Sequence, residues 1–110
     1  MNTFFSTGSK RSYIDFKKQV PPHLHSLVDS LREFCFSLGD NVVEDVRMHR
    51  IVLCKSITFR WFVDVEPEND AILLKIQRSR KEPQKKIRLK PNEDLKQIKE
   101  ILRDAFETIR

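Results

Sequence analysis

Glycine, cysteine and long apolar runs are scarce in this sequence. The chain of 110 residues contains two glycines and two cysteines. So few glycines exclude most glycine-rich loops that cradle phosphates, and two cysteines cannot build a disulfide framework. No apolar run is long enough to span a membrane, and no charged start leads into an apolar stretch. We therefore expect a cytoplasmic protein with no signal peptide and no membrane partner.

The composition is typical of one folded domain. Hydrophobic residues make up 39% of the chain and charged residues 34%, which suits a single core with a polar surface. We expect residues 1–19 to form a flexible N-terminal arm and residues 20–110 to form one domain. Tyr13, Ile14 and Phe16 are candidates for a short segment that docks on this domain.

Two hydrophobic periods alternate along the domain. Apolar residues recur at three- and four-residue steps over 23–38 and 95–109, which predicts two amphipathic helices. Residues 42–90 alternate with a period of two and predict about five strands, the clearest over 57–65. Gly39 is predicted to cap the first helix in a left-handed conformation, because glycine favours this position.

The order of these elements predicts an α+β fold with two layers. Consecutive strands with short turns indicate an antiparallel meander. Each amphipathic helix needs an apolar surface, so both are expected on one face of the sheet. Asn92 is predicted to be the N-cap of the second helix, because asparagine suits that position.

The net charge of +5 is concentrated in one segment. Residues 75–90 hold eight basic side chains and one acid, Glu82, a net charge of +7 that leaves −2 for the rest of the chain. Such a segment favours an anionic partner such as DNA or RNA, although it also suits a solvated loop that keeps the protein soluble. The candidate nucleic-acid-binding residues are Arg60, Lys75, Arg78, Arg80, Lys81, Lys85, Lys86, Arg88 and Lys90.

The sheet face opposite the helices is the second candidate surface. If the side that carries Trp61 meets the helices, Phe62 and Leu73 lie on the other side with Arg60 and Lys75. Basic residues beside an aromatic ring suit phosphate contact with base stacking. Equally, Phe62 and Leu73 are candidates for an interface with a second copy of the chain, or for a surface that the N-terminal segment covers.

The sequence contains no convincing catalytic or metal-binding pattern. Asp64 and Glu66 share a strand face, and paired carboxylates can bind a metal or exchange protons. A restriction-type nuclease would add a Glu-x-Lys pair, but the next strand reads Leu73-Leu74-Lys75. A metal-dependent nuclease is therefore only a remote alternative.

The histidines and cysteines do not strengthen the case for a metal. His23 and His25 are two residues apart, whereas zinc pairs on helices prefer four. Cys35 falls on an apolar stripe and Cys54 in a strand, where cysteine usually behaves as a small hydrophobe. We expect no metal, no cofactor and no catalytic site, and hence no enzyme.

Three short blocks resemble an uncharacterised small-domain family. The blocks are Leu31-Arg32-Glu33-Phe34 with Ser37-Leu38-Gly39-Asp40, then Phe62-Val63-Asp64-Val65-Glu66-Pro67, then Asp94-Leu95 with Arg103-Asp104-Ala105-Phe106-Glu107. Its members often carry the label "predicted transport protein" and occur alone or C-terminal to nuclease or restriction-type modules. The resemblance covers roughly residues 20–110 and implies a helix, antiparallel sheet, helix domain.

The same resemblance implies no catalytic residues, and nothing in this chain supports the transport label. Typical members carry glycine and histidine between the last two strands, where this chain has the basic residues 78–86. Any role of that loop is therefore not carried over. By association alone, the resemblance implies a restriction- or nuclease-associated protein as a partner.

The sequence therefore predicts a non-enzymatic domain of unknown function. We expect it to bind nucleic acid, or a protein that handles nucleic acid, through residues 75–90. The mechanism would be neutralisation of phosphates without base-specific readout. The alternative is a homodimerisation or protein-interaction module that uses the open face of the sheet.

Overall fold

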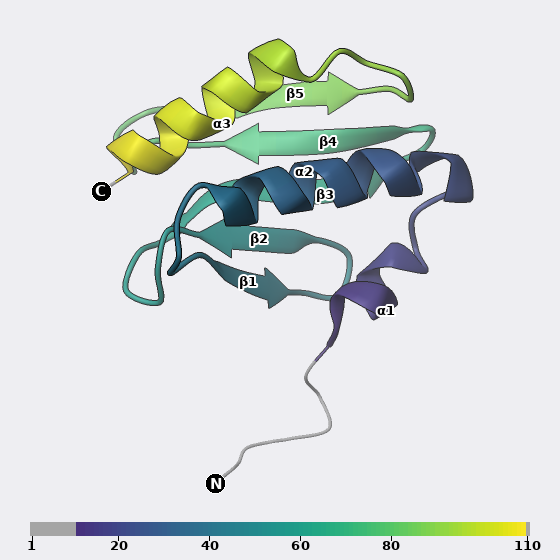
Figure 1. The fold of residues 1–110 in the computed structure, drawn as a ribbon, viewed down its shortest axis with the longest axis horizontal. Helices are drawn as coiled ribbons and strands as arrows, with labels where there is room; N and C mark the ends of the chain where they lie inside the picture. The colour runs from purple at the N-terminus through teal and green to yellow at the C-terminus, as the bar shows by residue number, and fades with distance from the viewer. Residues whose placement is uncertain (1–10, 110) are drawn as a thin grey trace, which may run out of the picture.

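Five strands in chain order form one antiparallel sheet, and two long helices cover one side of it (Figure 1). The computed structural model describes residues 11–109. Its strands are β1 (Val43–Val46), β2 (Ile51–Cys54), β3 (Trp61–Glu68), β4 (Ala71–Ile76) and β5 (Lys85–Leu89). Its helices are α1 (Tyr13–Lys17), a 3-10 turn (Pro22–Leu24), α2 (His25–Ser37) and α3 (Lys96–Thr108). The predicted α+β fold, with a meander between two helices on one face, is confirmed.

The core lies between the sheet and the two long helices. Helix α2 buries Leu27, Leu31 and Cys35, and α3 buries Ile98 and Leu102. Each large apolar side chain buried in this way stabilises the fold by about 1.5–3 kcal/mol. The strands supply Ile51, Leu53, Val63, Val65, Ile72, Leu74, Ile76 and Leu89.

The two helix caps predicted at Gly39 and Asn92 differ from those in the structure. Gly39 has no positive φ, but a Cβ atom there would lie 2.7 Å from Cζ of Phe106. Glycine therefore allows the close approach of that ring and does not form a left-handed cap. Asn92 is left-handed, with a φ of 68°, and lies before the helix. The N-cap position predicted for Asn92 is taken by Leu95, whose side chain makes no capping hydrogen bond, and the carboxylate of Asp94 accepts the N–H of Lys96 at 3.0 Å.

Part of the predicted N-terminal arm is packed on the domain. The hydroxyl of Ser12 accepts the N–H of Asp15, and the carboxylate of Asp15 accepts the N–H of Ser12, which closes a capping box. Phe16 is fully buried in the core. Phe16 and Tyr13 thus pack on the domain as predicted for a docking segment, whereas Ile14 is exposed, and residues 1–10 of the predicted arm lie outside the described part of the chain.

The longest predicted strand begins four residues later than the sequence pattern indicates. Its pairing with β2 shifts register at the start: Leu53 lies opposite Val63, but Cys54 lies opposite Trp61. Phe62 is left without a partner in β2, which is the arrangement of a β-bulge. The extra residue breaks the strict alternation on which the sequence prediction depends.

The bulge places Phe62 on the helix side of the sheet together with Val63, where strict alternation would place Trp61. Phe62 is 0% exposed, and its ring meets the ring of Phe106 edge-on at 5.5 Å between centroids. Trp61 shares the opposite side with its partner Cys54 and is only half-buried. The expected position of Phe62 on the open face is therefore wrong, and Trp61 lies there instead.

Candidate nucleic-acid interface

We call the side of the sheet that faces away from α2 and α3 the open face. Within residues 11–109, all helices lie on the other side (Figure 1). The strand register therefore decides which side chains are available on the open face. They include Val43, Asp45, Val52, Cys54, Trp61, Asp64, Glu66, Glu68, Ala71, Leu73, Lys75, Lys86 and Arg88.

The acidic side chains of β3 neutralise several bases on this face. Each of its three carboxylates has a basic partner from another part of the sheet. The pairs are Arg50 Nε–Asp64 Oδ2 at 3.4 Å, Lys75 Nζ–Glu66 Oε1 at 3.2 Å and Arg88 Nε–Glu68 Oε1 at 3.5 Å. Two residues predicted to bind nucleic acid, Lys75 and Arg88, therefore already have a carboxylate partner.

The centre of the open face is covered by its own side chains. Asp64 and Val52 are almost fully buried, although no helix of the described chain lies over them. Burial raises the pKa of Asp64, and the nearby Arg50 and Lys75 oppose this effect. Leu73 is on the open face as predicted, and it is half-buried. The face is therefore mainly a polar surface, with its apolar residues beneath charged ones.

Arg78 stabilises the loop between β4 and β5. Its guanidinium donates to both oxygens of Glu82, at 2.9 and 2.8 Å, and to Asp104 of α3 at 3.1 Å. These two carboxylates raise the pKa of Arg78. Gln77 adds a hydrogen bond of 2.6 Å from Nε2 to the carbonyl of Glu82. Arg78 therefore joins the loop to α3 and is not available for a phosphate.

The remaining bases of the segment point in different directions. Lys85 lies opposite Ile76, on the helix side of the sheet. There it lines a hollow of about 580 Å³ between the β4–β5 loop and α3. Lys86 lies on the open face opposite Lys75, and Lys90 is exposed beyond the end of β5. The nine predicted residues therefore do not form one patch.

Arg60 and Trp61 form the most distinctive contact near the open face. The guanidinium carbon of Arg60 lies 4.8 Å from the centroid of the indole ring. Its Nη1 donates to the Trp61 carbonyl at 3.4 Å, and within residues 11–109 it has no carboxylate partner. Burial is the main cause that lowers the pKa of Arg60, and the positive charge of Arg80 lowers it further. The positive charges of Arg60 and Arg80 therefore repel each other.

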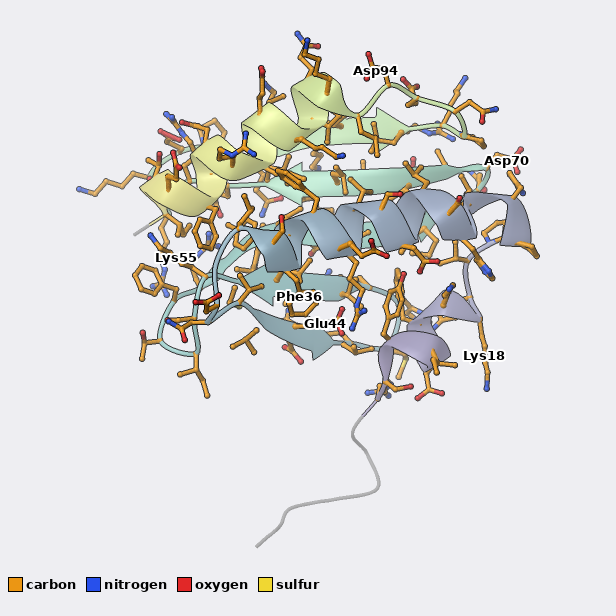
Figure 2. The ribbon with its side chains drawn as sticks, viewed as in Figure 1. Lys18, Phe36, Glu44, Lys55, Asp70 and Asp94 are labelled. Atoms are coloured by element: carbon orange, nitrogen blue, oxygen red, sulfur yellow. The ribbon has the colours of Figure 1, made fainter. Side chains whose placement is uncertain are left out.

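Four of the predicted bases that have no ion pair in the described part of the chain lie towards one end of the sheet. The β2–β3 and β4–β5 loops are both at this end (Figure 1). Figure 2 labels Lys55 there, whose ammonium lies over the rings of Phe59 and Phe106, at 5.4 and 5.1 Å. We call the four bases the basic end; they are Arg60, Arg80, Lys81 and Lys86.

The candidate metal and thiol residues are arranged differently from a reactive site. Glu66 is paired with Lys75, and no cluster of three or more potential ligands occurs within residues 11–109. Burial raises the pKa of Cys35 to about 12, and burial also raises the pKa of Cys54. Neither cysteine therefore has the lowered pKa of a reactive thiolate.

The sequence did not predict the position of Trp61 on the open face, nor which of the bases have a carboxylate partner. The chain has a single tryptophan, next to an arginine, and this pair was the available signal. The pattern placed Trp61 in the core because the bulge could not be read from the alternation. The ion pairs of Lys75, Arg78 and Arg88 could not be read either, because they depend on the register and on the approach of α3.

The comparisons with known proteins identify no relative. No protein-family model, no curated protein and no solved structure matches this chain. The resemblance to the small-domain family therefore stays a prediction. None of the helices in the described part is sufficiently long and apolar to cross a membrane.

Proposed function

We propose that this domain is a non-enzymatic nucleic-acid-binding module that contacts phosphates through the basic end. The observation that carries the proposal is the position of Arg60 and Arg80 in two loops at the same end of the sheet, where neither has a carboxylate partner within residues 11–109 and the charge of Arg80 lowers the pKa of Arg60. Like charges held near each other repel, and an anion placed beside both removes that repulsion. A phosphate group suits the planar donors of arginine.

The ion pairs of the sheet reduce the number of residues that we propose to bind phosphate. Lys75 and Arg88 lie close to acids, so a phosphate would have to compete with Glu66 and Glu68. Arg80 and Lys81 are exposed and have no such competitor in the described chain. The proposal therefore narrows the nine predicted residues to the four of the basic end. Because the contacts are to phosphates, binding is expected to be independent of sequence and to weaken with salt.

Fluorescence anisotropy with labelled DNA and RNA at several salt concentrations tests the proposal. The double variant Arg60→Ser/Arg80→Ser is expected to bind about tenfold more weakly or worse, with a salt slope lower by about 2. Lys75→Ser/Arg88→Ser is the matched control, because it changes the net charge by the same amount but removes paired bases. It is expected to lose less than about threefold.

Equal losses in the two double variants would contradict a defined basic end and leave only a general charge effect. The absence of salt-dependent binding in the unmodified protein would remove the proposal altogether. Circular dichroism of both variants must match the parent chain, so that a loss of binding is not a loss of folding.

A second candidate function is homodimerisation through the open face. It is favoured by Leu73, a half-buried apolar residue on a face that no described helix covers. It is weakened by the burial of Val52 and Phe62, since these apolar residues are already covered within one chain. Sedimentation velocity at several protein concentrations tests it. A dimer that Leu73→Ser dissociates would favour this candidate, and a monomer at all concentrations would exclude it.

A further inference from the structure

The β-bulge presents the only tryptophan of the chain on the open face. At this position β3 has just begun, and the preceding residues 55–60 form a loop without regular structure. Trp61 is half-buried and does not belong to the apolar cluster between sheet and helices. A large aromatic ring outside the core has a surface available for another planar group.

Arg60 extends this aromatic surface with a planar cation. Its guanidinium lies over the indole, with 4.8 Å from the guanidinium carbon to the ring centroid. A guanidinium has two faces, and the indole uses one of them. Nucleic-acid bases stack on arginine planes as well as on aromatic rings. The pair of Arg60 and Trp61 therefore offers a stacking surface at the end of the sheet where the β4–β5 loop carries Arg80 and Lys81.

The loop before Trp61 adds an apolar side chain. Ile57 is 87% exposed, the most exposed of the large hydrophobic residues in the described chain. It lies in the same loop as Arg60 and Phe59, at the same end of the molecule as Lys55 (Figure 2). An exposed isoleucine next to bases can contact the apolar face of a nucleobase that is not paired.

We infer that the basic end selects single-stranded nucleic acid, with an unpaired base stacked on Arg60 and Trp61 and the neighbouring phosphates bound by Arg80 and Lys81. This inference rests on the proposed function and names its substrate class. A duplex offers phosphates but keeps its bases paired and stacked, so it cannot use this surface without being opened. A single strand offers phosphates and unpaired bases, and stacking of this kind tolerates every base.

The chain provides its own probe, because fluorescence of the single tryptophan reports directly on this surface. Titration with a twelve-residue oligothymidylate, or the corresponding oligouridylate, is expected to change the emission of Trp61. A duplex of the same length is expected to leave the emission nearly unchanged and to bind at least about fivefold more weakly.

Substitution of Arg60 separates stacking from charge. Arg60→Lys keeps the charge and removes the plane, so it is expected to lower single-strand affinity about fivefold or more and to leave duplex affinity nearly unchanged. Arg47→Lys is the matched control, because Arg47 is exposed and paired with Asp45 at 3.2 Å. This control is expected to leave the affinity for single strands unchanged.

The failures of the two proposals are distinguishable. Equal affinity for single strand and duplex, no change in Trp61 emission and a harmless Arg60→Lys would overturn the single-strand inference alone. In that case salt-dependent binding that Arg60→Ser/Arg80→Ser abolishes would still support the proposed function. No binding to any nucleic acid, with binding to vesicles of anionic lipid instead, would overturn both.

Discussion

Arg32 and Arg60 each lie over an aromatic ring, but their surroundings differ. The guanidinium of Arg32 lies 4.1 Å from the ring centroid of Tyr13 and 5.0 Å from that of Phe36. It also donates two hydrogen bonds to Glu44, at 2.5 and 3.1 Å. Figure 2 labels Phe36 and Glu44 in this region. Arg60 lies over one ring and has no carboxylate partner within residues 11–109.

The pKa values of the two arginines move in opposite directions. The hydrogen bonds that Arg32 donates to Glu44 are the main cause that raises the pKa of Arg32. Burial, followed by the charge of Arg80, lowers the pKa of Arg60. The first arginine is satisfied within the fold, where it joins α1, α2 and β1. The second is held in a partly buried position without a counter-charge, which is the condition under which binding of an anion gains most.

The largest expected effect on stability tests whether Phe62 belongs to the core and Trp61 lies outside it. Phe62→Ala should lower the free energy of unfolding by about 3–5 kcal/mol, because it removes a fully buried ring and leaves a cavity beside Phe106. Trp61→Phe should change stability by less than about 1 kcal/mol, since Trp61 lies outside the core. Urea unfolding measures both. A similar loss in the two variants would mean that Trp61 also belongs to the core.

The fold was readable from the sequence wherever periodicity alone decides it. The apolar stripes of α2 and α3, the number of strands and their meander order were predicted correctly. The start of β3 was not, because Ile57 and Phe59 continue the alternation although they lie in a loop. A single extra residue at a bulge moves the side chains that precede it to the opposite face of the sheet. Only the pairing with the neighbouring strand reveals the bulge.

The second-largest expected effect on stability distinguishes Arg32, which stabilises the fold, from Arg60, which is proposed to bind nucleic acid. Arg32→Ala should cost about 1–2 kcal/mol of unfolding free energy, because it leaves the carboxylate of Glu44, which is 12% exposed, without its partner. Arg32 itself is 32% exposed, which keeps the loss below that of a fully buried pair. Arg60→Ala should stay within about 0.5 kcal/mol of the parent chain. Chemical unfolding and oligonucleotide binding, measured on the same two variants, should rank them in opposite orders.

The candidate site was less predictable than the fold. The concentration of charge in residues 75–90 was visible, but a charge count does not distinguish bases with partners from those without. Glu68 lies 20 residues before Arg88, and Asp104 lies 26 residues after Arg78. These separations carry no sequence signal, because strand pairing and helix packing bring the groups together. The sequence therefore indicated an anionic partner, and the structure was needed to narrow the residues.

The smallest expected effect on stability concerns Asp29 and Asp64, whose pKa values move in opposite directions. Hydrogen bonds from Tyr13 at 2.7 Å and Lys17 at 3.0 Å hold the pKa of Asp29 below its ordinary value. Burial raises the pKa of Asp64, whose Oδ1 has no hydrogen-bond partner in the described chain. Ionised Asp29 therefore stabilises the fold at neutral pH, whereas ionised Asp64 lowers its stability.

These directions predict opposite pH dependences for two matched variants. A lowered pKa in the folded state gives stability that is lost as the pH falls through that pKa, so the deficit of Asp29→Asn should shrink on acidification. A raised pKa makes the parent chain gain stability as the pH falls, so any advantage of Asp64→Asn at pH 7 should shrink towards pH 4. Both changes are expected to be below about 1 kcal/mol. Urea unfolding at several pH values measures them, and an Asp64→Asn advantage that grows on acidification would show that Arg50 outweighs burial at this site.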